Sequence, residues 1–252
     1  MKSKSNIYLI FFLLLPFLFS SCITNKQKVY LQKEGENKTY KVTPFEEYKL
    51  CINDEIIYYL MSTNEDTQYL YNAGSTGVSS QQRGSVYRIY EDGCVVLPTI
   101  GKVYLVGLTL REAERELTKK FQGLVGDAEI KIAMSNNYFY VLGDNGKGQF
   151  YAYKENLNIF QALAMAGDIT TTGSKDNIKI IRRGNDGLDH VQTIDLRKES
   201  IVESEFYYIY PNDVIYIPTN PNSFFRVDSF SGFVALILTP LSLLTLSISL
   251  LK

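Results

Sequence analysis

The sequence predicts an α+β protein in which two compact, strand-rich domains precede a C-terminal transmembrane helix. Most of residues 48–220 consists of short alternating or apolar segments separated by turn residues, a pattern typical of sheets. Only two stretches of this region, 109–121 and 158–166, have the apolar spacing of helices. The run 229–251 contains no charged residue, and its apolar part forms a helix about 28 Å long, close to the hydrocarbon thickness of a bilayer.

The chain begins with a predicted export signal. Lys2 and Lys4 precede the apolar stretch 7–19, which is short for a membrane span, and small residues lead to Cys22. A cysteine at such a junction resembles a lipoprotein processing site, in which cleavage leaves an acylated N-terminal cysteine that anchors the chain. We therefore predict a lipoprotein signal peptide over 1–21 and lipidation of Cys22. An ordinary cleavable signal with an incidental cysteine is the alternative.

Composition narrows the class of protein. The formal net charge is −1, so no basic field indicates a nucleic-acid partner. The 19 tyrosines and 14 phenylalanines, with no tryptophan, suit a strand-rich protein with aromatic surfaces. Cys51 and Cys94 are able to pair in an oxidising compartment or to serve as small buried apolar residues. The sequence leaves both possibilities open.

The first predicted domain covers residues 48–135 and follows a polar, weakly patterned tether over 22–47. It opens with an alternating and then apolar segment, which predicts a turn at Asn53 and Asp54 followed by a strand. Residues 63–84 are rich in Ser, Gly, Asn and Gln. We predict a long loop there, either functional or disordered.

The rest of the first domain contains the clearest predicted helix. Strands are expected at 85–90 and 94–97, around an Asp-Gly turn. Thr109 is a suitable N-cap, and Glu112 completes a capping box. A strand over 128–134 follows the helix. The apolar stripe of this helix consists of Leu110, Ala113, Leu117 and Phe121.

The second predicted domain covers residues 136–220 and has a different element order. It opens with a hairpin around the Gly-rich turn 143–148, and a helix over 158–166 follows. A second hairpin occupies 177–196, and the segment 205–218 closes the domain. A hairpin, a helix and further strands make a compact α+β unit.

A short internal repeat links the two domains. Residues 50–54 (LCIND) align with 209–213 (IYPND), and an apolar strand follows each. Asn and Asp side chains satisfy the backbone of a turn, so the repeat indicates at least shared turn chemistry.

Three blocks of the sequence resemble the outer-membrane polysaccharide-export lipoproteins, which export capsule and exopolysaccharide. Residues 48–60 are similar to the opening segment of the family, with Asn53 in place of the usual Gly. Residues 87–121 resemble its most recognisable block. Residues 139–183 resemble a soluble-ligand-binding β-grasp (SLBB) domain, although the usual glycine and proline pattern of its hairpin is altered at 143–148.

The resemblance implies a polysaccharide-export domain over 48–135 and an SLBB β-grasp domain over 136–220. It also implies a ring-forming homo-oligomer, an octamer, whose C-terminal helices, here 224–252, assemble into a pore through the outer membrane. The chain would be lipid-anchored there, with mostly periplasmic domains. The implied partners are outer-membrane lipid, the polysaccharide in transit, and an inner-membrane polysaccharide co-polymerase, often a tyrosine autokinase.

The C-terminal helix carries a stripe of hydroxyl side chains. At 100° per residue, five hydroxyl residues fall within about 120° of one another, and Ser247 is the exception. A helix in a ring can turn such a stripe toward water or toward its neighbour. A simple anchor whose hydroxyls bond to its own carbonyls is the alternative. Pro240 is expected to kink the helix or mark an irregular turn. The predicted pore-lining residues are Ser231, Thr239, Ser242, Thr245 and Ser249.

The sequence contains no catalytic or metal-binding pattern. His190 is the only histidine and is predicted to lie on the surface, and no HExxH, GxSxG or Cys/His cluster occurs. No Ser or Thr follows Lys147, so the Gly-rich turn is not a phosphate loop. We predict no enzyme activity, no cofactor and no metal. Two functions remain open: an export channel, or a lipid-anchored periplasmic adaptor or ligand-binding module without a pore.

Overall fold

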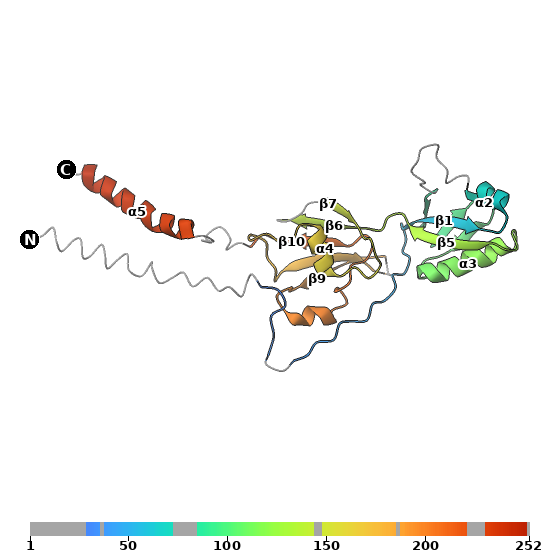
Figure 1. Ribbon diagram of the computed structural model, residues 1–252, viewed down its shortest axis with the longest axis horizontal. Coiled ribbons are helices and arrows are strands. Elements are labelled where there is room, and N and C mark those ends of the chain that lie inside the picture. The colour runs from blue at the N-terminus through green and yellow to red at the C-terminus, as the bar shows by residue number, and fades with distance from the viewer. Residues whose placement is uncertain are drawn as a thin grey trace, which may run out of the picture.

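The computed structural model describes residues 29–35, 38–72, 85–143, 148–184, 187–220 and 230–250. The predicted signal peptide, Cys22 and most of the predicted Gly-rich turn lie outside these residues. Two hydrophobic cores follow one another along the longest axis of the molecule, and helix α5 lies beyond the second core (Figure 1). The predicted strand-rich α+β architecture is confirmed.

The first domain is built on a small antiparallel sheet of order β2-β1-β5, beside the hairpin β3-β4. Strand β1 follows the Asn53-Asp54 turn as predicted, and its apolar run alternates in burial, with Ile56, Tyr58 and Leu60 in the core. Helix α3 packs on this sheet (Figure 1). The elements are β1 (Glu55–Met61), α2 (Glu65–Asn72), β2 (Tyr87–Arg88), β3 (Cys94–Leu97), β4 (Gly101–Tyr104), α3 (Leu110–Gln122) and β5 (Glu129–Met134).

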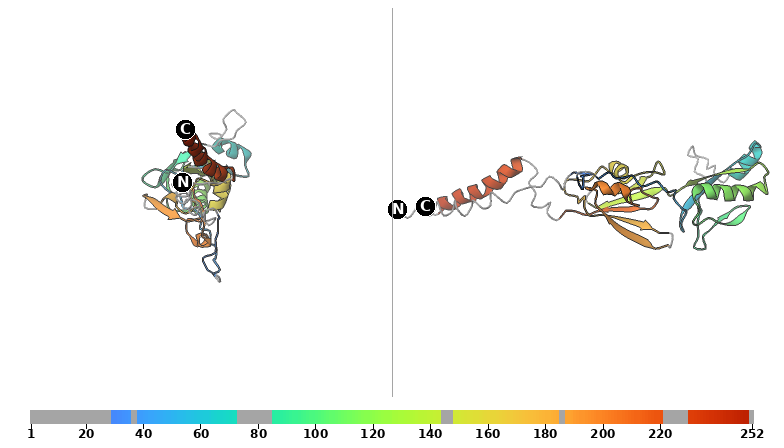
Figure 2. Two further views of the ribbon diagram at one scale, coloured as in Figure 1. Left: turned by 90° about the vertical axis from the view of Figure 1, so that its left-hand side faces the viewer. Right: turned by 90° about the horizontal axis from the view of Figure 1, so that it is seen from below.

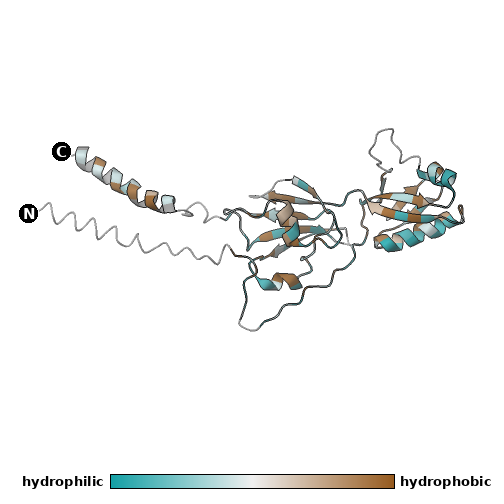
Figure 3. Cartoon of the chain, viewed as in Figure 1, coloured by the Kyte–Doolittle hydropathy of each residue, from teal (hydrophilic) through white to brown (hydrophobic). Residues whose placement is uncertain are grey.

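Helix α3 begins where the sequence predicts. The Thr109 hydroxyl accepts the Glu112 backbone N–H at 3.3 Å, and the Glu112 carboxylate accepts the Thr109 N–H at 2.9 Å, so the predicted capping box is present. The helix buries Ala113, Leu117 and Phe121. Arg111, Arg115, Lys119 and Lys120 are exposed, and most of the helix is coloured hydrophilic in Figure 3.

Helix α2 corrects the prediction of a structureless loop over 63–84, of which residues 73–84 lie outside the described part. The Asn64 side chain accepts the Thr67 N–H at 3.1 Å and caps the helix, but α2 has no buried residue. It is held instead by Asn72, whose side-chain amide bonds both the N–H (3.0 Å) and the carbonyl (2.9 Å) of Leu60 on β1. Tyr71 also packs edge-on against Phe121 of the core, but this apolar contact gives no helical periodicity, so the pattern could not reveal the helix.

The second domain is a five-stranded sheet of order β7-β6-β10-β8-β9, with helix α4 across one face (Figures 1 and 2). Strands β6 and β10 are parallel and lie at the centre, and the other pairs are antiparallel. The elements are β6 (Tyr138–Gly143), β7 (Gly148–Tyr151), α4 (Ile159–Met165), β8 (Ile178–Arg183), β9 (Asp189–Ile194), the 3-10 helix η4 (Glu199–Glu203) and β10 (Val214–Ile217).

Two local features fix this arrangement. Helix α4 has its own capping box between Asn158 and Gln161, and it ends before Gly167, whose φ of +95° suits glycine. Gly143 ends β6 with a φ of +117°, and a Cβ there would lie 1.9 Å from the carbonyl oxygen of Ile217. The close approach of β6 and β10 therefore requires glycine at this position.

The predicted tether over 22–47 is not a free linker in its described part. The Leu31 N–H donates to the Leu196 carbonyl at 3.2 Å, and the Thr43 N–H donates to the Val202 carbonyl at 2.8 Å. The Tyr30 hydroxyl bonds Asp168, and Lys175 Nζ lies 3.6 Å from the centroid of the Tyr30 ring. These segments run along the second domain and lead into the first (Figure 1).

Helix α5 spans Phe230–Leu250 and continues through Pro240 without interruption. The prediction of a helix in this region is therefore confirmed. Within the described residues, no helix has the combination of length and apolar character that crossing a membrane requires, so the predicted transmembrane helix over 224–252 is not confirmed.

The strands of the second domain connect two opposite ends of that domain. Strands β6 and β10 start beside the first domain, where the Asn212 N–H donates to the Tyr138 carbonyl at 2.7 Å. At the other end, β10 leads to Thr219 and Asn220, which bond the loop 170–173. Tyr30 bonds Asp168 at the start of the same loop. The described N-terminal segment and the exit toward α5 therefore lie at the same end.

Candidate functional site

The contact between the two domains contains the repeated turn that the sequence reveals. Asn53 and Asn212 have φ values of 72° and 67°, which explains why glycine is usual at the first of these positions. The carboxylate of Asp54 accepts the Cys51 N–H at 2.8 Å, and that of Asp213 accepts the Tyr210 N–H at 2.9 Å. The two segments therefore form the same turn, and each turn leads into a strand, β1 or β10.

The two turns meet across the domain boundary. Asp54 is buried and accepts the Tyr48 hydroxyl at 2.9 Å, and the Asn212 amide lies 3.4 Å from its other oxygen. Burial raises the pKa of Asp54, and its hydrogen bonds from Cys51 and Tyr48 oppose that rise. A carboxylate of the first domain and an amide of the second thus form a direct polar contact.

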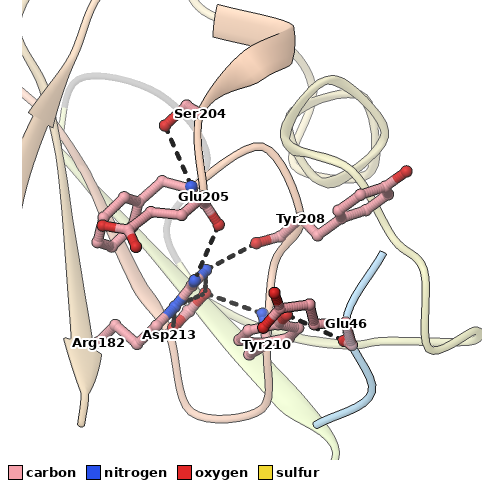
Figure 4. Close-up of polar contacts among 8 residues, drawn as sticks. Glu46, Arg182, Ser204, Glu205, Tyr208, Tyr210 and Asp213 are labelled. Carbon is pink, nitrogen blue, oxygen red and sulfur yellow. Dashed lines mark hydrogen bonds and ion pairs between the residues drawn. The ribbon is translucent and has the colours of Figure 1, made fainter. Parts of the chain in front are cut away.

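Asp213 is completely buried and is neutralised by Arg182 of strand β8 (Figure 4). Arg182 Nε lies 3.0 Å from Asp213 Oδ1, and Nη2 lies 2.7 Å from Oδ2, so the pairing is bidentate. Nη2 also donates to the carbonyl of Tyr208 (2.7 Å), and Nη1 donates to that of Glu205 (3.2 Å). An arginine that makes four such hydrogen bonds fixes the loop before β10.

Aromatic rings enclose this ion pair and connect it to the N-terminal segment. The Arg182 guanidinium lies 4.7 Å from the Phe206 ring centroid and 4.4 Å from that of Tyr210. The Tyr210 hydroxyl donates to the Glu46 carbonyl at 3.0 Å (Figure 4). The Tyr48 and Tyr210 rings are 5.8 Å apart. The segment that enters the first domain is therefore held against the second.

A cleft of about 470 Å³ opens beside this network, between the second domain and the segment 43–51. Its walls combine carboxylates, guanidinium groups and phenol rings, and they include no histidine. Such walls suit a hydroxyl-rich polar molecule and offer no nucleophile paired with a base. In the described part of the chain, no group of His, Cys, Asp and Glu side chains is arranged to hold a metal ion. The charged and aromatic lining comprises Glu46, Glu47, Tyr48, Lys49, Arg182, Arg183, Glu203, Glu205, Tyr208 and Tyr210.

The predicted pore-lining residues all lie on helix α5, far along the chain from the cleft, and their side chains are exposed. The hydroxyls of Thr239, Ser242, Thr245 and Ser249 donate to carbonyls of their own helix. The distances are 2.7 Å from Thr239 to Ala235, 2.8 Å from Ser242 to Thr239, 2.8 Å from Thr245 to Ser242 and 2.7 Å from Ser249 to Leu246. This is the bonding expected of a simple anchor. Because each hydroxyl donates its proton, its oxygen keeps lone pairs that can accept hydrogen bonds on the exposed side of the helix. Ser231 is the fifth residue of this stripe.

The structure also places the remaining residues that the sequence singles out. Cys22 lies outside the described residues. Cys51 is buried, Cys94 is half-buried, and both are free thiols. His190 is exposed on β9, on the surface as predicted.

Sequence reasoning missed Arg182 and the burial of Asp213. The repeat marks both Asn-Asp turns, but it carries no sign that one aspartate is neutralised by an arginine in a strand 31 positions earlier. The only available signal was the charge of Arg182 at a core-facing position of β8, between Ile180 and the turn. Alternation along a short strand is a weak basis for that inference.

Two strand-rich domains, joined at the repeated turns beside a polar and aromatic cleft, therefore make up the described core of the chain. Residues 42–135 match the model of the polysaccharide biosynthesis/export protein family. The match identifies this stretch as a polysaccharide biosynthesis/export domain, as the sequence resemblance predicts. It gives the protein a role in polysaccharide export, and this family is one of transport components rather than enzymes.

Proposed function

We propose that the chain is an outer-membrane lipoprotein that assembles into a ring-shaped channel for capsular or exopolysaccharide. Lipidated Cys22 and helix α5 would both engage the outer membrane, and the two domains would stand in the periplasm. The export domain supports the general role. The arrangement of the chain supports the more specific one.

The observation that carries this proposal is that both membrane-directed segments leave the same end of the second domain. Tyr30 and Thr219 lie at the two sides of the loop that starts at Asp168. Seven residues lie between Cys22 and Tyr30, and these eight residue-to-residue steps reach at most about 28 Å. Nine residues lie between Asn220 and α5, with a reach of about 35 Å. One membrane can therefore hold both, with the export domain on the far side.

Helix α5 has the character expected of a helix in a collar formed by several copies. It carries no charge, its exposed residues include Leu238, Leu241 and Leu246, and it also displays the hydroxyl stripe. In a collar, the apolar side would face lipid or a neighbouring helix, and Ser231, Thr239, Ser242, Thr245 and Ser249 would face the lumen. Their free lone pairs could accept hydrogen bonds from water around a hydrated glycan.

The second domain is proposed to be an SLBB-type β-grasp domain. Its sheet order, with β6 and β10 parallel at the centre and α4 across one face, supports this assignment. The cleft beside Arg182 gives it a polar, aromatic surface next to the export domain. The first domain, at the end away from α5, would meet the inner-membrane co-polymerase.

A second candidate function is a lipid-anchored periplasmic adaptor or ligand-binding module without a pore. The observation that favours it is the bonding of the α5 hydroxyls to carbonyls of their own helix. A helix satisfied in this way needs no polar neighbour.

Particle imaging of the full-length, detergent-extracted protein separates the two functions. A closed ring with a helical collar supports the channel, whereas a monomer excludes it. In cells, charged substitutions along the stripe, such as Thr245→Asp, should preserve export. The matched change Leu244→Asp, one position away and on the side of the helix opposite the stripe at 100° per residue, should abolish it. Equal tolerance of both changes would contradict the lumen assignment.

A further inference from the structure

The N-terminal segment lies on the second domain without entering its core (Figure 1). We call its described residues, 29–35 and 38–47, the strap. None of them is buried, and Leu50 is the first buried residue of the described chain. Strands β6, β8 and β10, by comparison, each bury two residues. A segment that buries so little opens at a lower free energy than the core, so the strap is able to leave the domain while the sheet stays folded.

The first attachment of the strap is formed by Tyr30. Its hydroxyl donates to Asp168, and its ring lies 5.9 Å, centroid to centroid, from that of Phe160 on α4. Lys175 Nζ lies 3.6 Å from the centroid of the Tyr30 ring, which makes a cation–π contact. Asp168 and Lys175 flank the loop that also pairs with Thr219, so this attachment lies at the end of the domain that leads to α5.

The second attachment lies near the joint with the first domain. The Thr43 N–H donates to the Val202 carbonyl at 2.8 Å, and the Thr43 hydroxyl donates to the Glu203 carbonyl at 3.0 Å. The Phe45 and Tyr208 rings pack edge-on with their centroids 5.2 Å apart. None of these five residues is buried, so water takes over the hydrogen bonds when the attachment opens.

Aromatic rings connect the two attachments through the second domain. Tyr207 lies between them, with its ring centroid 6.4 Å from that of Phe160 and 5.0 Å from that of Tyr208. Phe160 contacts Tyr30 at one end of this series, and Tyr208 contacts Phe45 at the other. Such contiguous packing gives the two attachments a physical connection, so that release of one end weakens the other.

Docking of the strap determines how far the second domain can lie from residue 22. With the strap docked, eight residue-to-residue steps connect Cys22 to Tyr30, and they reach at most about 28 Å. With the strap released, 28 steps connect Cys22 to Leu50, and they reach about 98 Å. The exit toward α5, at Asn220, lies at the end of the domain that the docked strap holds. Docking therefore brings the start of α5 toward the membrane to which Cys22 would be attached.

We propose that the strap is a releasable brace between the membrane and the second domain. Docked, it holds the end that leads to α5 beside the membrane that carries Cys22. Released, it lets both domains move away while the chain stays attached through Cys22. The inference rests on the proposed function for the lipid anchor and for the membrane position of α5, and it adds an order of events: the strap docks before α5 enters the membrane.

Hydrogen exchange of the full-length, detergent-extracted protein measures the release. The Leu31 and Thr43 N–H groups each donate to a backbone carbonyl of the second domain, so their exchange reports the two attachments. The paired amides of β8 and β10 report opening of the core. In the wild type, the two strap amides should open at least about 100-fold more often than those of β8 and β10, while staying protected relative to an unfolded chain.

Tyr30→Ala should raise the opening constant at Leu31 by about 100-fold, because the hydrogen bond, the ring contact and the cation–π contact are all lost. It should also raise the opening constant at Thr43, to which the aromatic series connects Tyr30. Tyr30→Phe keeps the ring and loses only the hydrogen bond, so the rise at Leu31 should be about tenfold. Tyr153→Ala is the matched control, because Tyr153 belongs to the same domain, is 60% exposed and has its ring contact with the adjacent Lys154. The control should exchange like the wild type.

Each outcome of the exchange experiment decides the proposal. Strap amides that exchange as slowly as those of β8 and β10 would show that the strap is part of the core, and unprotected strap amides would show that it is not docked. Either result overturns the brace. A rise at Leu31 without one at Thr43 would overturn release as a unit. Particle imaging of the same sample tests the channel separately: a ring with a fixed strap overturns only the brace, and a monomer with a releasing strap overturns only the channel.

A photo-crosslinking residue at Thr219, in cells that make the full chain, tests the consequence for α5. In the wild type it should label membrane lipid. Tyr30→Ala combined with Thr43→Pro removes contacts at both attachments and should lose most of this labelling, whereas Tyr153→Ala should keep it. Equal labelling in the double variant would overturn the brace. A wild type that labels no lipid would contradict the membrane position of α5 that the proposed function supplies.

Discussion

Replacing Arg182 by alanine is the sharpest test of the joint between the two domains. Asp213 has no exposed surface, and Arg182 is its only charged partner among the described ion pairs. The substitution leaves a carboxylate in the interior that keeps its hydrogen bond from the Tyr210 N–H but loses its charged partner. It also frees the carbonyls of Glu205 and Tyr208, which hold the loop before β10.

The expected loss follows from the burial of the pair. Breaking a buried ion pair by removing one partner costs about 3–5 kcal/mol, because the remaining charge is left uncompensated. The Arg182 side chain is 15% exposed and its partner 0%, so solvent cannot replace the arginine. The opening constant of the second domain should therefore rise by roughly two to three and a half orders of magnitude.

The next residue provides the matched control. Arg183 pairs with Asp189 at 3.0 Å, but these side chains are 43% and 55% exposed. Arg183→Ala should cost only about 0–1 kcal/mol, as solvent-exposed pairs do. Adding Asp213→Asn to Arg182→Ala should recover part of the loss, because a neutral amide needs no cation.

Hydrogen exchange is the suitable assay, because two cores need not unfold in one step. Peptides covering β8 and β10 should lose protection in Arg182→Ala and keep it in Arg183→Ala. Peptides from β5, in the first domain, report whether the effect stays local. Equal protection of β8 and β10 in the two single variants would refute the assignment of Arg182 and Asp213 as the structural centre of the joint.

Two further predictions concern the first domain. Thr109→Ala removes the cap of α3 and should lower the free energy of unfolding by about 1 kcal/mol, whereas Thr109→Ser should retain most of it in a denaturant titration. Asp127 accepts hydrogen bonds from Ser62 and Thr63, which lower its pKa to about 2. The stability that ionised Asp127 gives to the folded state is fully present above the pKa of an aspartate in the unfolded chain, near 4, and it is lost as the pH falls through about 2. Hydrogen exchange of α2 should therefore differ between wild type and Asp127→Asn at pH 6, and a difference that persisted unchanged at pH 2 would contradict this linkage.

Features encoded locally could be read from the sequence. The helix after Thr109 follows from a side-chain cap and an apolar stripe, both of which lie within a few residues. The repeated Asn-Asp turns and the apolar strand that follows each of them are equally local. Each of these features depends on backbone chemistry that neighbouring side chains satisfy, so no knowledge of the tertiary fold was needed.

Features that depend on distant partners could not be read in the same way. The side-chain amide of Asn72, at the end of α2, bonds Leu60 of β1 and holds the helix in place. The Thr43 N–H donates to the Val202 carbonyl and holds the N-terminal segment. Neither contact leaves a periodic pattern. The partnership of Arg182 with Asp213 likewise exists only once β8 and β10 are adjacent. The cleft, which these contacts shape, was therefore beyond sequence reasoning.

The repeated turn gives the joint its geometry, because the two copies face each other. Asp54 receives only neutral donors from Tyr48, Cys51 and Asn212, whereas Asp213 has a bidentate arginine. The amide of one turn reaches the carboxylate of the other, so neither domain can rotate without exposing or unpairing a buried aspartate. The tether adds a further connection between Tyr210 and the backbone of Glu46. A joint restrained in this way fixes the position of the export domain relative to the second domain, at the end opposite the one from which α5 leaves. In the ring proposed above, the copies would therefore present their export domains at one level.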